Sequence, residues 1–325
     1  MATEATTQVR ATRAASAPVA LRTLGLTKRY GERLAVDHLD LEIRQGEVFG
    51  FLGPNGAGKT TTIRMALGLI RPTDGSVQVL GRDVAADRAE ILPKVGALVE
   101  QPALYLYLSG RDNLRAIANT LGGVSERRID EVLELVALKG RDDDRVKTYS
   151  LGMKQRLGVA MALLHDPDLL ILDEPANGLD PAGIVEMRDL LRQLAAQGKT
   201  VFVSSHVLTE VRQICDRVAI LSKGKLVTVA DIDTLVGSHG AFRVTFEPGR
   251  ATEALAAAKR QPWGASARLE ADGALVVTAP DGHGRELNLF LVNAGFAPET
   301  IAPYSEDLEA VFLRLTGESS GDTSR

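Results

Sequence analysis

The segment VFGFLGPNGAGKTTTIRMALGLI, residues 48–70, constrains this chain more than any other part of it. It has the pattern of a short apolar strand, a glycine-rich turn and a helix, and the turn fits the spacing G-x-x-x-x-G-K-[ST]. Glycines in such a turn let the backbone curl until successive N–H groups point at a phosphate. The segment therefore predicts a nucleoside triphosphate-binding loop, set between a strand and a helix of an α/β fold.

Individual residues of this phosphate loop, Gly53–Thr60, are predicted to bind different parts of the nucleotide and its metal ion. Lys59 supplies a point charge to the outer phosphates, and the Thr60 hydroxyl is a suitable ligand for Mg²⁺. The motif alone does not say which class of NTPase this is. The predicted nucleotide-binding residues are Gly53, Pro54, Asn55, Gly56, Ala57, Gly58, Lys59, Thr60 and Thr61.

A second segment, DLLILDEP, supplies two acids at the end of an apolar run. A near-continuous apolar run of this length indicates a strand of a parallel sheet that is buried on both faces. Asp173 at its carboxyl end is predicted to hold Mg²⁺ through water. Glu174 is predicted to take a proton from an attacking water as a general base. Two adjacent acids on a buried strand would be costly without such a role.

His206 follows another strand, TVFVSS, at the edge of the presumed sheet where ligands bind. A lone histidine at that place would more often be a helix cap. Beside the other motifs it is interpreted as a contact to the γ-phosphate.

Strands alternate with helices over much of the chain, which predicts a mostly parallel α/β sheet. The part between Pro102 and His165 has a helical character, with SERRIDEVLELVAL (125–138) presenting one apolar face after the predicted cap Ser125. The predicted domains are a flexible tail (1–18), a nucleotide-binding domain (19–237, helical part about 102–165), a small α+β domain (240–316) and a polar tail (317–325).

The small domain is predicted from a pattern that restarts after Gly237. AFRVTF is expected to form a strand, ATEALAAAKRQ a helix, and SARLE with ALVVTA a hairpin. Two further helices are expected at ELNLFLVNAGF and EDLEAVFLRLT. This domain carries no chemical motif.

The net charge and the cysteine content argue against several classes of protein and of metal site. A net charge of −4 argues against a general nucleic-acid binder. The single cysteine, Cys215, permits no intrachain disulfide and no zinc cluster. The amino terminus lacks the apolar core of a signal peptide, and no window reaches the roughly 18 consecutive apolar residues of a spanning helix. A cytoplasmic protein without its own transmembrane segment is expected.

The ordered set GPNGAGKTT, YSLGMKQR, LLILDEP, NGLDP and SSH resembles the ATP-binding subunit of ABC transporters, from about Ala20 to Gly237. The resemblance implies a P-loop NTPase of the ABC type, with an antiparallel N-terminal β part and a helical subdomain, using ATP and Mg²⁺. It also implies that Glu174 is the catalytic base, that His206 is the switch histidine, and that Asp180 and Tyr30 contact nucleotide, Tyr30 by stacking on adenine.

The signature segment YSLGMKQR, Tyr149–Arg156, begins with a predicted helix cap, Ser150, and with free N–H groups that suit an anion. In the family this segment faces ATP held by the other subunit of a head-to-tail dimer, so Ser150 and Gly152 would contact the γ-phosphate there. Leu151 and Met153 stand where the family commonly has Gly and Gln. The family's Q-loop glutamine aligns with Glu100, with Gln101 one step later, and either side chain is a candidate metal ligand.

The resemblance implies an ATPase subunit of a homodimer, or of a heterodimer with a related subunit, enclosing two ATP molecules. It would drive a separate multispanning membrane permease from the cytoplasmic face, contacting it through the segment near Glu100–Leu121. The exporter branch for drugs, antibiotic peptides or lipids fits best. One alternative is a soluble ABC ATPase acting on ribosomes or DNA, although one cassette and no heptad run argue against it. A non-catalytic ATP-binding regulator is the other, opposed by the joint presence of Lys59, Asp173, Glu174 and His206.

Overall fold

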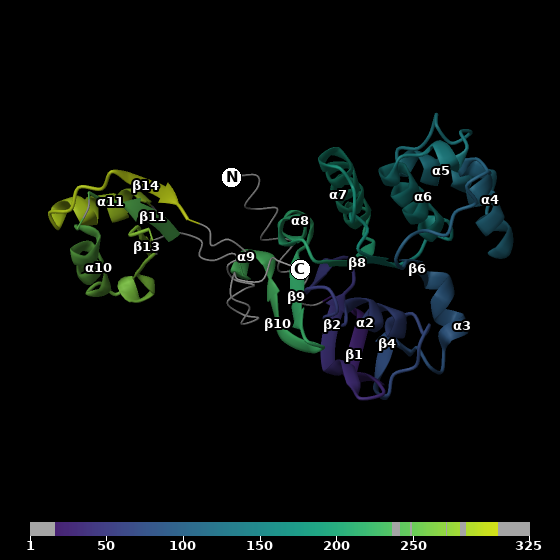
Figure 1. Ribbon diagram of the computed structural model, residues 1–325, viewed down its shortest axis with the longest axis horizontal. Helices are drawn as coiled ribbons and strands as arrows, with labels where there is room; N and C mark the ends of the chain where they lie inside the picture. Colours follow the sequence, from purple (N-terminus) through teal and green to yellow (C-terminus); the bar gives the residue numbers. More distant parts are fainter. Residues whose placement is uncertain (1–16, 236–240, 248, 271, 280–283, 305–325) are drawn as a thin grey trace. The chain divides into compact units, whose positions relative to one another are not determined.

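The computed structural model describes residues 17–235, 241–247, 249–270, 272–279 and 284–304. The chain divides into two compact units, residues 1–230 and 231–325 (Figure 1). The boundary between the units lies before Gly237, after which the sequence predicted a second domain. Strand β10 (Lys225–Asp231) still belongs to the main sheet of the first unit and ends close to this boundary.

The first unit is built on a six-stranded sheet in the order β10-β9-β3-β8-β7-β6. Pairing is parallel from β9 through β3, β8 and β7 to β6. Every residue of β3, β7 and β8 is buried, as the apolar runs predicted for a sheet covered on both faces. The strands besides β10 are β3 (Val48–Leu52), β6 (Val95–Leu98), β7 (Leu169–Asp173), β8 (Thr200–Ser205) and β9 (Arg217–Ser222).

The first unit also contains a four-stranded antiparallel sheet in the order β2-β1-β4-β5. Two of its strands come before β3 in the sequence, and the other two come between β3 and β6. The strands are β1 (Val19–Tyr30), β2 (Arg33–Arg44), β4 (Asp74–Val79) and β5 (Arg82–Asp83). One hydrophobic cluster joins the two sheets, including Leu26 and Leu39 from the antiparallel sheet with Phe51 and Phe202 from the parallel one. The predicted mixture of a mostly parallel sheet with an antiparallel N-terminal part is confirmed.

Among the described residues of this unit, four α-helices lie outside its helical part: α2 (Lys59–Ala66), α3 (Arg88–Ile91), α7 (Pro181–Ala196) and α8 (Leu208–Ile214). The prediction that the helix after the phosphate loop continues to Ile70 is wrong. Gly68 has a φ of 63°, and this left-handed conformation follows the C-cap Leu67 and ends the helix at Ala66.

Helices α4 (Gly110–Thr120), α5 (Glu126–Leu135) and α6 (Leu151–Leu163) lie side by side and form the helical subdomain (Figure 1). Each begins at a serine whose side chain accepts a hydrogen bond from the backbone N–H three residues later: Ser109, Ser125 and Ser150. The predicted caps Ser125 and Ser150 are therefore confirmed. The apolar face predicted for α5 is also buried.

The second unit contains an antiparallel sheet in the order β12-β13-β11-β14. Its elements are α9 (Ile232–Leu235), β11 (Ala241–Thr245), α10 (Ala251–Lys259), β12 (Arg268–Leu269), β13 (Leu275–Thr278), α11 (Gly284–Asn293) and β14 (Thr300–Pro303). Strand β14 was not expected from the sequence. The helix predicted at EDLEAVFLRLT and most of both predicted tails lie outside the described residues.

None of the helices in the described ranges combines the length and the apolar composition that crossing a bilayer requires.

Candidate active site

Three parallel strands bring the predicted motifs to one edge of the sheet. Strands β3, β8 and β7 are neighbours, with Leu52 opposite Ser205 and Asp173 opposite Ser204. The carboxyl ends of parallel strands meet at one edge, where ligands of such sheets bind. The phosphate loop, Asp173 and Glu174 at the end of β7, and His206 after β8 therefore share that edge, although more than 100 residues separate Thr60 from Asp173 in sequence.

The phosphate loop needs glycine at two positions for steric reasons. Gly58 has a φ of 109°, and a Cβ there would lie 2.5 Å from the Ala35 carbonyl oxygen. A Cβ on Gly53 would lie 2.7 Å from the Leu221 carbonyl oxygen. Gly58 is also the N-cap of α2 and provides no side-chain cap, so the first N–H groups of α2 are left for an anion.

Lys59 reaches back over the loop that it follows. Its side chain is only 6% exposed. The ammonium donates to the Gly53 carbonyl oxygen at 2.6 Å and to that of Pro54 at 3.3 Å. The same nitrogen lies 3.1 Å from Glu174 Oε1. The loop backbone and one carboxylate thus hold the cation at the loop.

Asp173 is buried and receives two hydroxyl hydrogen bonds, one on each carboxylate oxygen. Thr60 Oγ1 donates to Oδ2 at 2.8 Å, and Ser204 Oγ donates to Oδ1 at 2.5 Å. Ser204 Oγ also accepts from the Glu174 backbone N–H at 3.0 Å. Sequence reasoning missed Ser204, although a hydroxyl inside the otherwise apolar strand TVFVSS was a usable signal.

Glu174 is held in an uncommon conformation at the end of β7. Its φ of 51° is left-handed, which is rare for a residue other than glycine and is concentrated at functional sites. Oε2 lies 2.7 Å from His206 Nδ1. Oε1 is buried and accepts no hydrogen bond within the described residues, although the Lys59 ammonium is close. The carboxylate therefore stands between a lysine and a histidine with one oxygen still able to accept.

Lys59, Thr60, Glu174 and His206 line one cavity of about 490 Å³. Most of the predicted loop residues, Glu174, His206 and Tyr30 are among its walls. Three others were missed: Arg33 and Ala35, close to Tyr30 in sequence, and Asn177, which belongs to the NGLDP motif. The lining residues are Tyr30, Arg33, Ala35, Asn55, Gly56, Gly58, Lys59, Thr60, Thr61, Glu174, Asn177 and His206.

Six predicted nucleotide-binding residues do not line this cavity: Gly53, Pro54 and Ala57 within the phosphate loop, and Ser150, Gly152 and Asp180 outside it. Ser150 is exposed, and its hydroxyl accepts from the Met153 N–H at 3.2 Å. Asp180 is exposed and caps α7, accepting from the Gly183 N–H at 2.8 Å. Both therefore lie at helix starts outside the cavity of their own chain.

The two unusual signature positions differ in what they contact. Leu151 is 41% exposed and packs beside the NGLDP loop, because a Cβ on Gly178 would lie 3.1 Å from Leu151 Cδ2. Met153 donates its backbone N–H to the cap. The substitution at Leu151 thus adds an apolar contact between two motifs of one chain.

The candidate metal ligands Glu100 and Gln101 do not line the cavity either. Glu100 has a φ of 63°, and its Oε1 lies 2.5 Å from Arg64 Nη2. Its side chain is 62% exposed, and Gln101 is exposed as well. Glu100 is thus paired with a cation on α2 in this structure.

Comparison with known proteins agrees with this geometry. A family model described as "ABC transporter" matches residues 36–177. The chain is 42% identical over 298 residues to "Bacitracin transport ATP-binding protein BcrA" of Bacillus licheniformis, covering 91% of this chain and 97% of that protein. It is 54% identical over 208 residues to "Uncharacterized ABC transporter ATP-binding protein YhcH" of Bacillus subtilis (strain 168), covering 64% and 68%. A solved structure described as "Structure of ATP binding subunit of ABC transporter" superimposes with a TM-score of 0.59 at 29% identity, covering 66% of this chain and 91% of that one.

Proposed function

Because this chain belongs to the ABC transporter family as an ATP-binding ATPase subunit, we propose that its cavity is one half of a composite site that hydrolyses ATP to drive a separate membrane permease. The observation that carries the proposal is the convergence of Lys59, Thr60, Asp173, Glu174 and His206 at one sheet edge. Lys59 and the N–H groups of the loop hold the outer phosphates.

The residues present fit a magnesium ion. The Thr60 hydroxyl and the Asp173 carboxylate are 2.8 Å apart, and oxygen atoms of these kinds are the ligands that Mg²⁺ prefers. The described residues include no group of three or more His, Cys, Asp or Glu side chains able to hold a metal. Thr60 and Asp173 would therefore share the ion with phosphate and water oxygens. When bound, Mg²⁺ neutralises charge that develops on the phosphates.

Glu174 is the proposed general base. Its buried Oε1 accepts no hydrogen bond in the described structure, so it keeps the capacity to accept one from the attacking water. Lys59 now lies beside that oxygen, and the outer phosphates compete for the same ammonium. Nucleotide binding therefore frees Glu174 from Lys59, while the contact with His206 Nδ1 keeps the carboxylate oriented.

The half-site is completed by a second subunit, either another copy or a related chain. Ser150, Gly152 and Asp180 lie outside the cavity of their own chain, and Ser150 and Asp180 are exposed. Their position supports contact with the nucleotide of the opposing subunit. Two such half-sites would enclose two ATP molecules.

A crosslink between chains tests this arrangement. Cys215, the single native cysteine, is buried, and burial raises the pKa of its thiol, so it stays unreactive. A Ser150→Cys chain mixed with an Asn55→Cys chain is expected to form a bismaleimide-linked pair in ATP, detected as a doubled mass on a denaturing gel. Neither chain alone forms that product. A double-cysteine chain that links only within itself would contradict the composite site.

The permease partner is supported by an exposed apolar strip in the helical subdomain. Tyr105, Leu106, Tyr107 and Leu108 are 62%, 45%, 79% and 39% exposed. Large apolar side chains exposed in a run of this kind are typical of an interaction site. The strip lies in the segment near Glu100–Leu121 proposed to contact the permease, at the cytoplasmic face of the membrane. The name of the Bacillus licheniformis relative points to antibiotic peptides as the transported class.

The metal contact of the Q-loop is proposed for Glu100. Replacing Glu100 by alanine is expected to raise the Mg²⁺ concentration for half-maximal ATPase activity on the order of tenfold, the scale for losing one group from a metal's ligand shell. Gln101→Ala serves as the matched variant and should change it little. Phosphate release measured against Mg²⁺ concentration separates the two. The reverse pattern would assign the contact to Gln101.

A further inference from the structure

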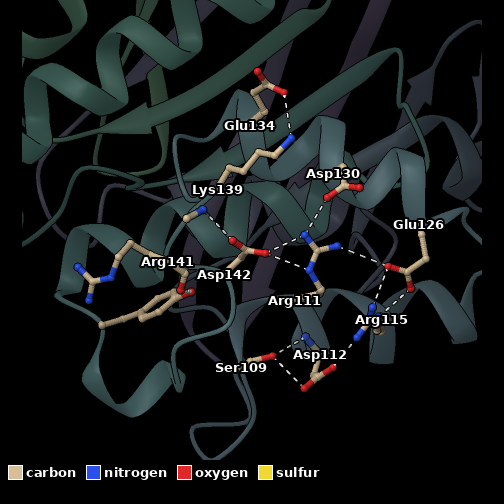
Figure 2. Close-up of polar contacts among 12 residues, drawn as sticks. Ser109, Arg111, Asp112, Arg115, Glu126, Asp130, Glu134, Lys139, Arg141 and Asp142 are labelled. Atoms are coloured by element: carbon tan, nitrogen blue, oxygen red, sulfur yellow. Dashed lines mark hydrogen bonds and ion pairs between the residues drawn. The ribbon is translucent and has the colours of Figure 1, made fainter.

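A polar network in the helical subdomain centres on Arg111, the second residue of α4 (Figure 2). Its guanidinium reaches three acids. Nε and Nη2 donate to Asp142 Oδ2 at 2.9 and 2.7 Å, and Nη2 also donates to Asp130 Oδ1 at 2.7 Å. Glu126 lies at the margin, 3.5 Å from Nη1. Arg111 therefore ties α4 both to α5 and to the α5–α6 loop, residues 136–150, which ends at Ser150.

Asp142 is the anchor of that loop. Its side chain is only 8% exposed, and its Oδ1 accepts from the Gly140 N–H at 2.8 Å. Burial would raise the pKa of this carboxyl, but the hydrogen bonds from Arg111 and Gly140 outweigh burial and hold the pKa below its usual range. The backbone adds a further bond, because the Arg111 N–H donates to the Asp142 carbonyl oxygen at 2.9 Å.

The contacts continue from Asp142 to the signature segment. The Val146 and Lys147 N–H groups donate to the Leu108 and Leu106 carbonyl oxygens at 2.9 and 2.8 Å. Tyr149 is 4% exposed, and its hydroxyl donates to the Arg141 carbonyl oxygen at 2.7 Å. A Cβ on Gly110 would lie 2.3 Å from that hydroxyl, so Tyr149 sits directly against the start of α4.

We infer that Arg111 is a positioning residue for the Ser150 hydroxyl, acting through Asp142 and Tyr149, and that it thereby sets how readily two subunits close on ATP. The inference rests on the proposed function, in which Ser150 acts on the nucleotide of the opposing subunit. Arg111 lies on the helix that follows the exposed strip Tyr105–Leu108, and the strip's carbonyl groups bind the same loop. One set of hydrogen bonds thus joins the strip to the loop that carries the signature segment. Arg111 holds this loop in place through its contacts with Asp142.

The test uses ATP-driven dimer formation in a Glu174→Gln background, followed by light scattering after gel filtration. Arg111→Met is expected to raise the ATP concentration needed for half-maximal dimer on the order of tenfold. The affinity of the monomer for ATP, measured with a fluorescent analogue at low protein concentration, should stay within about twofold. The nucleotide cavity contains no part of the network, so a positioning role predicts this split.

Arg115→Met is the matched control. Arg115 lies one turn later on α4 and is 45% exposed. It pairs with Glu126 and Asp112, and among the described residues its hydrogen bonds do not reach the α5–α6 loop. Dimer formation should be unchanged. If Arg111→Met fails to fold because Asp142 is left buried and unpaired, the double variant Arg111→Met/Asp142→Asn removes both charges and carries the test.

A double-mutant cycle decides whether Arg111 acts through Ser150. The effect of Arg111→Met on dimer formation should shrink when Ser150 is already alanine, since the group being positioned is gone. Three results would overturn the inference and leave the proposed function standing. They are an equal effect of Arg111→Met in both backgrounds, unchanged dimer formation by Arg111→Met, and a loss of monomer ATP affinity that matches the loss of dimer. A Glu174→Gln parent that never dimerises in ATP would overturn the proposed function, and the inference with it.

Discussion

Replacing Lys59 by alanine is expected to reduce ATP turnover on the order of 10²–10³-fold, the scale for removing one preorganised electrostatic contact from a site that excludes water. The buried ammonium is held at the loop by the Gly53 and Pro54 carbonyl oxygens. Alanine leaves the outer phosphates without their fixed cation, so nucleotide affinity should fall as well. Phosphate release and equilibrium nucleotide binding measure the two losses.

The control for this variant is Lys94→Ala, which removes an exposed lysine outside the cavity. It should hydrolyse ATP at the parent rate, which shows that the loss is not an effect of total charge. Normal hydrolysis by Lys59→Ala, in a sample whose thermal unfolding matches the parent, would remove the phosphate-loop assignment.

Glu174→Gln is expected to slow hydrolysis by on the order of 10²–10⁴-fold while ATP still binds, because an amide of nearly the same shape cannot take the proton of the attacking water. The amide can keep a hydrogen bond to His206, now 2.7 Å from Glu174 Oε2. Closure on ATP would then not be followed by reopening, so the variant should accumulate as a dimer. Single-turnover hydrolysis and gel filtration in ATP report the two effects.

Glu186→Gln makes the same chemical change on α7, where the side chain is 54% exposed and pairs with Arg156. It should turn over at the parent rate and form no lasting dimer. Full hydrolysis by Glu174→Gln, with a monomer at every ATP concentration, would refute both the catalytic and the closure role.

Local patterns in the sequence were sufficient for the elements that carry the chemistry. The strand, glycine turn and helix of residues 48–66 follow from apolar patterning and from the spacing of the phosphate-loop motif. The caps Ser125 and Ser150 follow from a hydroxyl that bonds an N–H three residues later. Such features depend on neighbours within one turn of chain, so the sequence states them directly.

Some secondary structure depended on partners that a local pattern does not contain. Strand β14 pairs with β11, which lies more than 50 residues earlier, and its residues are mostly exposed, so no apolar alternation marked it. The end of α2 was set by the conformation of Gly68, which overrode the apolar residues that follow it.

The sequence by itself determined the fold family, the phosphate loop and the two acids, because their residue types and spacing follow from the chemistry of phosphate and metal. Only the tertiary structure decided how these groups meet. It placed Ser204 between Asp173 and Glu174, set Lys59 against Glu174, and paired Glu100 with Arg64. Each of these contacts joins elements that are distant in sequence, and their geometry depends on strand register and on a left-handed residue, neither of which a single segment encodes.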